Sequence, residues 1–144
     1  MATTSTATAR WDGVLKSGAG TYEAASGAFK GNYTFATRFE GAQGTNPEEL
    51  IAAAHAACLS MALSAGLEKA GTPATSITTT AACTMDRVAG ASKITKMHLT
   101  VRGKVSGIDN DAFVSAADGA KENCPVSQAL KGNVAVELDA ALES

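Results

Sequence analysis

Alternating apolar and polar residues in the middle of the chain predict two half-buried strands. The odd positions of residues 77–85 are apolar or small except for Thr79, and those of residues 97–105 are all apolar or small. Successive side chains on a strand point to opposite faces, so one face of each strand is expected to pack on a core. The even positions of the second strand are polar and predict a face in water; they are Lys96, His98, Thr100, Arg102 and Lys104. Helices are therefore expected on one side of the sheet only.

Weaker strand patterns lie toward both ends of the chain. Residues 9–16 and 19–25 predict a hairpin, and residues 32–38 predict a third strand. In residues 134–142 the even positions are apolar and predict a last strand. The first nine residues are rich in Thr and Ala and are expected to be loosely held.

A long helix is predicted between these regions because both of its ends carry helix-boundary residues. Asn46 suits the N-cap, Pro47 the first helical position, and Glu49 the third position of a capping box. The helix is expected to reach about Lys69, because Gly71 supplies a left-handed C-cap.

Two shorter helices are expected near the C-terminus. One covers residues 112–122 behind a cap at Asp109 or Asn110, and the other covers residues 125–131. Strands and helices arranged in blocks indicate an α+β fold with antiparallel pairing. At 144 residues, the chain is expected to form a single domain over residues 1–144.

Composition narrows the class of partner. Twelve Lys and Arg against 14 Asp and Glu leave a net charge of −2, which argues against a nucleic-acid surface. Residues 50–67 carry no charge, yet alanines and polar residues interrupt them, which favours a buried helix in a soluble protein over a membrane span. Without a signal-peptide pattern, the expected compartment is the cytoplasm. Aromatic residues are only 5% of the chain, and so thin a core favours a second subunit.

The chain has three cysteines, which is an odd number, and they lack CxxC spacing; both facts argue against a disulfide framework. Cys58 lies in the middle of the apolar helix, where burial raises a thiol pKa and activation needs a cation from elsewhere. Cys124 precedes Pro125 at a helix start, where the residues allow either a stabilised thiolate or a turn residue. Cys83 lies on the apolar face of a strand and is expected in the core. Residue chemistry alone therefore makes Cys124 the easier thiolate.

Five segments, in order along essentially the whole chain, resemble the OsmC/Ohr family. They are Thr37-Arg-Phe-Glu-Gly41, Gly44-Thr-Asn-Pro-Glu-Glu-Leu-Ile51, His55-Ala-Ala-Cys58, Ser60-Met-Ala-Leu-Ser64 and Asn123-Cys-Pro-Val-Ser-Gln128. The resemblance implies an enzyme, a thiol peroxidase that reduces organic hydroperoxides, and hydrogen peroxide less efficiently, in oxidative or osmotic stress. It also implies antiparallel sheets packed around a long central helix in an intertwined homodimer.

The same resemblance assigns roles to four residues. Cys58 falls on the peroxide-attacking cysteine, Cys124 on the resolving cysteine, Arg38 on the thiolate-activating arginine and Glu48 on its acidic partner. The implied cycle passes through a Cys58 sulfenic acid and a Cys58–Cys124 disulfide, which an external dithiol of the lipoyl type reopens. It requires no bound cofactor and no metal. Because this order reverses the ranking from residue chemistry, Arg38 must supply the activation of Cys58.

Helix geometry suggests a site shared between subunits. Glu48 and Cys58 are ten residues apart, so on one straight helix they stand about 15 Å apart and are rotated by roughly 80°. One arginine cannot touch both in that arrangement. If Arg38 pairs with Glu48, the sulfur that it meets is expected to belong to the other subunit. Without the resemblance, Arg38 is simply a solvated charge and Glu48 a first-turn acid that complements the helix dipole.

An alternative hypothesis is a dimeric, stress-associated binding domain without catalysis, in which the cysteines are structural. Its thiols should oxidise slowly and unselectively.

His55 precedes Cys58 by three residues, but no further ligand pair accompanies them, which argues against a metal site. For the peroxidase, the apolar neighbours Leu59, Met61 and Phe39 favour organic hydroperoxides as substrates.

Overall fold

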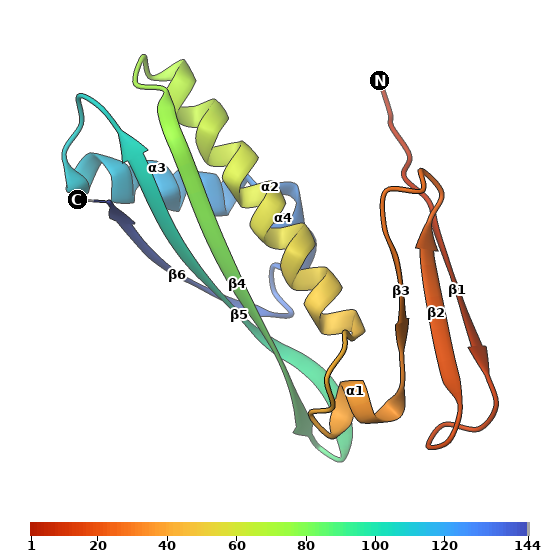
Figure 1. Ribbon diagram of the computed structural model, residues 1–144. Helices are drawn as coiled ribbons and strands as arrows, with labels where there is room; N and C mark the ends of the chain where they lie inside the picture. Colours follow the sequence, from red (N-terminus) through yellow and green to blue (C-terminus); the bar gives the residue numbers. More distant parts are fainter. Residues whose placement is uncertain (144) are drawn as a thin grey trace. The chain divides into compact units, whose positions relative to one another are not determined.

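The computed structural model describes residues 1–143. Its elements, in chain order, are β1 (Ala7–Asp12), β2 (Ala19–Ala24), β3 (Lys30–Tyr33), α1 (Phe35–Phe39), α2 (Pro47–Lys69), β4 (Ala74–Val88), β5 (Ala91–Val105), α3 (Asn110–Asn123), α4 (Pro125–Leu130) and β6 (Ala135–Leu142) (Figure 1). The α+β class is confirmed. Contacts divide the chain into two compact units, one ending at Leu50 and one beginning at Ile51. A single domain over residues 1–144 remains a prediction.

The first unit contains a three-stranded antiparallel sheet in the order β1–β2–β3. The predicted hairpin is confirmed, although its first strand begins at Ala7 and ends at Asp12. Residues 7–9, expected to be loosely held, therefore pair with β2. Three aromatic rings fill one side of this sheet, with Tyr33 lying 5.4 Å from Trp11 and 6.1 Å from Tyr22 between ring centroids. Such tilted ring pairs supply much of the apolar contact in this unit.

The prediction of a strand over residues 32–38 is wrong beyond Tyr33, because the chain turns there into α1. Thr34 Oγ1 accepts a hydrogen bond from the Thr37 backbone N–H at 3.2 Å, and Thr37 Oγ1 accepts one from the Thr34 N–H at 2.9 Å. This reciprocal capping box satisfies N–H groups that a helix start otherwise leaves unpaired. Local capping therefore outweighs β-propensity and places Arg38 in the last turn of a helix.

Both ends of α2 lie where the sequence predicts, but the Glu49 carboxylate binds the Thr45 hydroxyl in place of the Asn46 backbone N–H that the predicted capping box requires. Asn46 Oδ1 accepts from the Glu49 backbone N–H at 2.8 Å, while the Glu49 carboxylate accepts from the Thr45 hydroxyl at 2.7 Å. At the other end, Gly71 has a φ of +83°, and the Thr72 N–H donates to the Leu67 carbonyl at 2.9 Å. A left-handed glycine with this backward hydrogen bond is the usual way to end a helix.

The second unit contains the sheet β4–β5–β6. β4 and β5 pair antiparallel, but β6 pairs parallel to β5, so the expectation of purely antiparallel pairing is wrong for this last strand. The reason is topological: α3 and α4 carry the chain back along the sheet before β6 begins, and such a helical crossover permits parallel pairing. The expected apolar odd face of β5 is confirmed, because Met97, Leu99 and Val101 are fully buried.

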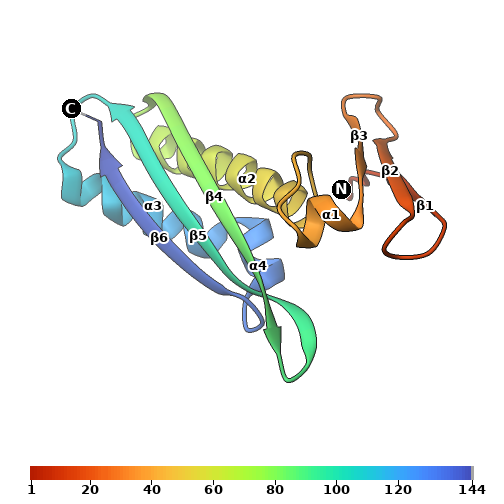
Figure 2. The same cartoon turned by 60° about the horizontal axis from the view of Figure 1, so that its bottom comes forward.

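Helices α2 and α3 cover the same face of this sheet, as predicted (Figures 1 and 2). Leu59, Leu63 and Leu67 of α2 join Phe113 and Ala117 of α3 in one core on β5. The α3 contact is close because Gly103 has no side chain: a Cβ there would lie 2.5 Å from the Phe113 ring. This packing fixes α3 against β5 and so places the α3–α4 junction beside α2.

One face of α2 remains exposed. The buried face is lined by His55, Leu59, Leu63 and Leu67, whereas Ala53, Ala54, Ala57, Met61 and Ala65 lie exposed. The helix is long and apolar enough to cross a membrane by length and composition, and 22% of its most apolar window is buried. Among the described residues, the expectation of a buried helix is therefore right for one face of α2 and wrong for the other.

Candidate active site

Two cysteines that are distant in sequence lie together in the second unit. Cys58 comes from the middle of α2, and Cys124 sits at the junction where α3 ends and α4 begins. Their side chains are hydrogen-bonded to each other, and both are free thiols. Cys124 has an extended backbone, φ −59° and ψ 123°, as expected before Pro125. The structure thus brings together the two cysteines that the family resemblance pairs.

The two sulfurs differ in access. Cys124 is fully buried, whereas Cys58 is only partly buried. A small molecule that approaches from solvent therefore reaches Cys58 first. Cys83 lies on the core-facing side of β4, opposite Met97 in register, and packs against the apolar core as predicted.

The environment of the pair raises the pKa of Cys58 and lowers the pKa of Cys124. Burial raises the pKa of Cys58, and the hydrogen bond to Cys124 and its charge raise that pKa further, against a smaller opposing effect of the Val126 N–H. Burial also acts to raise the pKa of Cys124, but hydrogen bonds from the Cys58 thiol, from the backbone N–H and hydroxyl of Ser127, and from the Val126 N–H outweigh it and lower that pKa. Cys124 is therefore the easier thiolate, as residue chemistry predicted.

A buried histidine and serine adjoin the cysteine pair. His55 Nε2 lies 2.7 Å from Ser127 Oγ, and both residues are buried. Burial lowers the pKa of His55, which favours the neutral imidazole. The sequence motifs do not single out Ser127, although a hydroxyl in the first turn of a helix, three residues after Cys124, can reach back to that N-cap residue.

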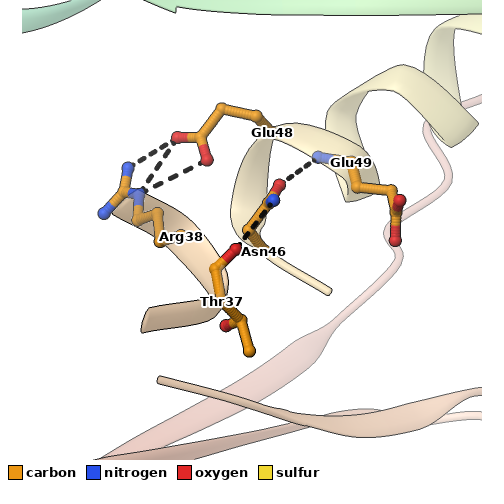
Figure 3. Close-up of polar contacts among 5 residues, drawn as sticks. All are labelled: Thr37, Arg38, Asn46, Glu48 and Glu49. Atoms are coloured by element: carbon orange, nitrogen blue, oxygen red, sulfur yellow. Dashed lines mark hydrogen bonds and ion pairs between the residues drawn. The ribbon is translucent and has the colours of Figure 1, made fainter. Parts of the chain in front are cut away.

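Arg38 and Glu48 form an ion pair in the first unit (Figure 3). Arg38 Nη2 donates to Glu48 Oε1 at 2.7 Å, and Arg38 Nε donates to both carboxylate oxygens at 3.2 and 3.3 Å. The Glu48 side chain is 8% exposed, while that of Arg38 is 35% exposed. The carboxylate therefore holds one edge of the guanidinium, and the partly exposed remainder keeps N–H donors for another anion.

The loop before α2 holds this ion pair in place. Asn46 Nδ2 donates to the Thr37 carbonyl at 3.4 Å, while its Oδ1 caps α2 (Figure 3). One amide therefore ties the last turn of α1 to the first turn of α2, the two turns that carry Arg38 and Glu48. The guanidinium also lies 5.3 Å from the centre of the Phe39 ring, a favourable cation–π distance.

The remaining residues considered from the sequence lie in different environments. Leu59 is fully buried in the core, whereas Met61 and Phe39 are exposed. Within residues 1–143, no group of three or more His, Cys, Asp and Glu side chains is arranged to hold a metal ion. His98 Nδ1 pairs with Glu137 Oε1 at 3.1 Å on the partly exposed face of β5 and β6.

Comparison with known proteins places this geometry in context. Residues 40–139 match a family model described as OsmC-like protein. The chain is 49% identical over 130 residues to Peroxiredoxin OsmC of Escherichia coli K12, covering 90% of this chain and 91% of that protein. It is 34% identical over 101 residues to the organic hydroperoxide resistance protein OhrB of Bacillus subtilis, covering 69% and 72% of the two chains.

Solved structures agree with these matches. The crystal structure of OhrB of Bacillus subtilis superposes with a TM-score of 0.69 at 28% identity, covering 94% of this chain and 97% of that chain. An organic hydroperoxide resistance protein from Elizabethkingia anophelis superposes with a TM-score of 0.80 at 24% identity, covering 99% and 100%, which bears on the fold alone.

Proposed function

Because the chain belongs to the OsmC-like family, we propose that it is a thiol peroxidase that reduces organic hydroperoxides to alcohols. The observation that carries this proposal is the hydrogen-bonded pair of Cys58 and Cys124, in which one sulfur is accessible and the other is buried. Such a pair suits a cycle in which one sulfur meets the oxidant and the other completes a disulfide. A smaller activity toward hydrogen peroxide belongs to the same proposal.

The first step is attack by the Cys58 thiolate on the distal oxygen of the hydroperoxide. A sulfur–oxygen bond forms, the oxygen–oxygen bond breaks, and the alkoxide leaves and takes a proton to become the alcohol. Cys58 is left as a sulfenic acid. Access favours Cys58 for this role although Cys124 ionises more readily, because the oxidant cannot reach a buried sulfur.

The second step joins the two sulfurs. Cys124 attacks the sulfur of the sulfenic acid, the sulfur–oxygen bond breaks, and hydroxide leaves and becomes water. An external dithiol, which we propose to be of the lipoyl type, then reduces the disulfide by attack through a mixed disulfide. Attack at the more accessible Cys58 sulfur would expel Cys124, whose lower pKa makes it the better leaving group.

Arg38 is proposed to activate Cys58. The Cys58 thiol needs a nearby cation, since burial and Cys124 raise its pKa. Arg38 offers a permanent positive charge held by Glu48 with donors to spare. Those donors can stabilise the thiolate and the charge that develops on the peroxide oxygens as the bond breaks.

The working form is proposed to be a homodimer. The exposed face of α2, with its four alanines and Met61 at 75% exposure, is uncharged and permits a second helix to approach closely. We further propose that the protein is soluble and cytoplasmic, binds neither nucleic acid nor membrane, and serves in oxidative or osmotic stress.

Titration with a limiting organic hydroperoxide tests the peroxidase proposal. One equivalent of oxidant should remove two thiols per chain, and peptide mapping should recover a Cys58–Cys124 disulfide. A Cys83→Ser variant serves as the control and should behave like the wild type. Slow, unselective loss of all three thiols would instead favour a non-catalytic dimeric binding domain with structural cysteines, and a disulfide to Cys83 would overturn the pairing.

Mixed dimers test whether the site is shared. Arg38→Met and Cys58→Ser should each be inactive alone. If Arg38 acts on the Cys58 of the other subunit, each mixed dimer has one intact site, and equal co-expression should regain about a quarter of wild-type activity. Mixed dimers without regained activity, or a fully active monomer by sedimentation at assay concentrations, would show that each site lies within one chain.

A further inference from the structure

His55 is a buried titratable residue that the two-cysteine cycle leaves unused. It lies fully buried on α2, with Nε2 at 2.7 Å from Ser127 Oγ. The Ser127 side chain is in turn hydrogen-bonded to Cys124, and Cys124 to Cys58. Side chains from α2 and from the α3–α4 junction thus form one continuous hydrogen-bonded chain, in the order His55, Ser127, Cys124, Cys58.

The direction of the hydrogen bonds follows from the chemistry of the groups. A thiolate only accepts, so the Ser127 hydroxyl donates to Cys124 and its oxygen is free to accept from His55 Nε2–H. His55 Nδ1 has no hydrogen-bond partner within residues 1–143. A bare lone pair there costs less than a buried N–H without an acceptor, which either the other tautomer or the imidazolium would create. The neutral Nε2–H form, which burial also favours by lowering the pKa of His55, therefore fits the site.

We infer that His55 and Ser127 form a relay that holds Cys124 as the thiolate that closes the disulfide. Ser127 touches the reacting sulfur, and His55 is a positioning residue that orients the Ser127 hydroxyl. The inference rests on the proposed peroxidase cycle and assigns residues to its second step. In that step a sulfur–sulfur bond forms between Cys124 and Cys58, the sulfur–oxygen bond of the sulfenic acid breaks, and hydroxide leaves and takes a proton from solvent.

The relay affects the two half-reactions in opposite directions, because the two sulfurs compete for a proton. A hydrogen bond that stabilises the thiolate on Cys124 favours the proton on Cys58. Loss of the Ser127 hydroxyl should therefore leave peroxide attack by Cys58 unchanged or faster, while it slows closure of the disulfide. General loosening of the site would slow both steps.

Rapid mixing of a Ser127→Ala variant with one equivalent of an organic hydroperoxide, followed by acid quench and mass spectrometry, separates the two steps. At pH 6 the disulfide should form about tenfold more slowly than in the wild type, as expected for a lost hydrogen bond to a charged group. At pH 9 the difference should shrink, because Cys124 then ionises without help. Three charged residues, Lys121, Glu122 and Lys131, line the cavity beside Ser127 and remain unchanged in the variant.

Three further variants complete the test. His55→Leu should slow closure in the same direction, and His55→Gln should restore much of the rate because its amide N–H can donate to Ser127. Ser115→Ala, an exposed serine on α3, is the matched control and should close at the wild-type rate. Equal closure rates for the wild type and Ser127→Ala at pH 6 would overturn the relay. Failure of the proposed peroxidase function would be distinct, because the wild type itself would then form no Cys58–Cys124 disulfide.

Discussion

The Arg38→Met variant is expected to lose about 10²–10³-fold in kcat/KM for organic hydroperoxides, the usual effect of removing one donor aimed at developing charge. Methionine keeps much of the side-chain volume but has no charge. Without the guanidinium, burial and Cys124 keep Cys58 protonated at neutral pH, and the departing alkoxide loses a hydrogen-bond donor. The measurement is the second-order rate of Cys58 oxidation by stopped flow.

Arg10→Met provides a matched control for this prediction. Arg10 also pairs with a carboxylate, Asp12, at 2.8 Å, and it also lies in the first unit, but both side chains of that pair are well exposed. An exposed ion pair contributes little, so the control should retain wild-type activity. Arg38→Lys should fall between the two, because an ammonium group restores the charge without the planar set of donors. Peroxide consumption by Arg38→Met at the wild-type rate would remove the proposed source of activation.

The Cys58→Ser variant is expected to lose peroxide reduction by on the order of 10³-fold or more, as removal of a nucleophile generally does. A serine hydroxyl does not ionise at neutral pH, and the buried Cys124 is out of reach of the oxidant. Cys124→Ser should behave differently: the first equivalent of hydroperoxide should react, and turnover should then stop. The readouts are steady-state peroxide consumption with a dithiol and single-turnover oxidation.

The state in which Cys124→Ser stops is diagnostic. A Cys58 sulfenic acid should accumulate and be captured by dimedone, with a mass increase on the peptide that contains Cys58. The Cys83→Ser variant should form no such adduct, because its Cys124 resolves the intermediate. If instead Cys58→Ser reacts with the first equivalent and then stops, while Cys124→Ser does not react even with the first equivalent, the roles of the two cysteines are reversed.

The N-terminal region shows where sequence patterns mislead. Residues 32–38 predict a strand, but the hydroxyls of Thr34 and Thr37 close a capping box and start α1. The Thr-x-x-Thr spacing was visible in the sequence. The strand prediction did not use this spacing, because the β-propensity of single residues does not account for hydrogen bonds between neighbouring side chains and backbone groups. The helical turn matters for the proposed function, because it orients Arg38 toward Glu48.

The sequence alone determined the local features of this protein. The ends of α2, the alternating faces of β4 and β5, and the extended backbone before Pro125 follow from residue type and spacing. It also determined the ranking of the two thiols, because an apolar mid-helix site and a helix start act on pKa through their nearest neighbours.

The tertiary structure decided which groups distant in sequence come into contact and how deeply each is buried. Core packing of α3 on β5 places Cys124 and Ser127 against α2, where they contact Cys58 and His55. The tertiary structure also decided that β6 pairs parallel to β5, because α3 and α4 carry the chain back along the sheet, and that one face of α2 is exposed, because the sheet covers the helix on one side only. The physical reason is that such contacts depend on burial shared among many residues, whereas periodicity reports only the face of its own element.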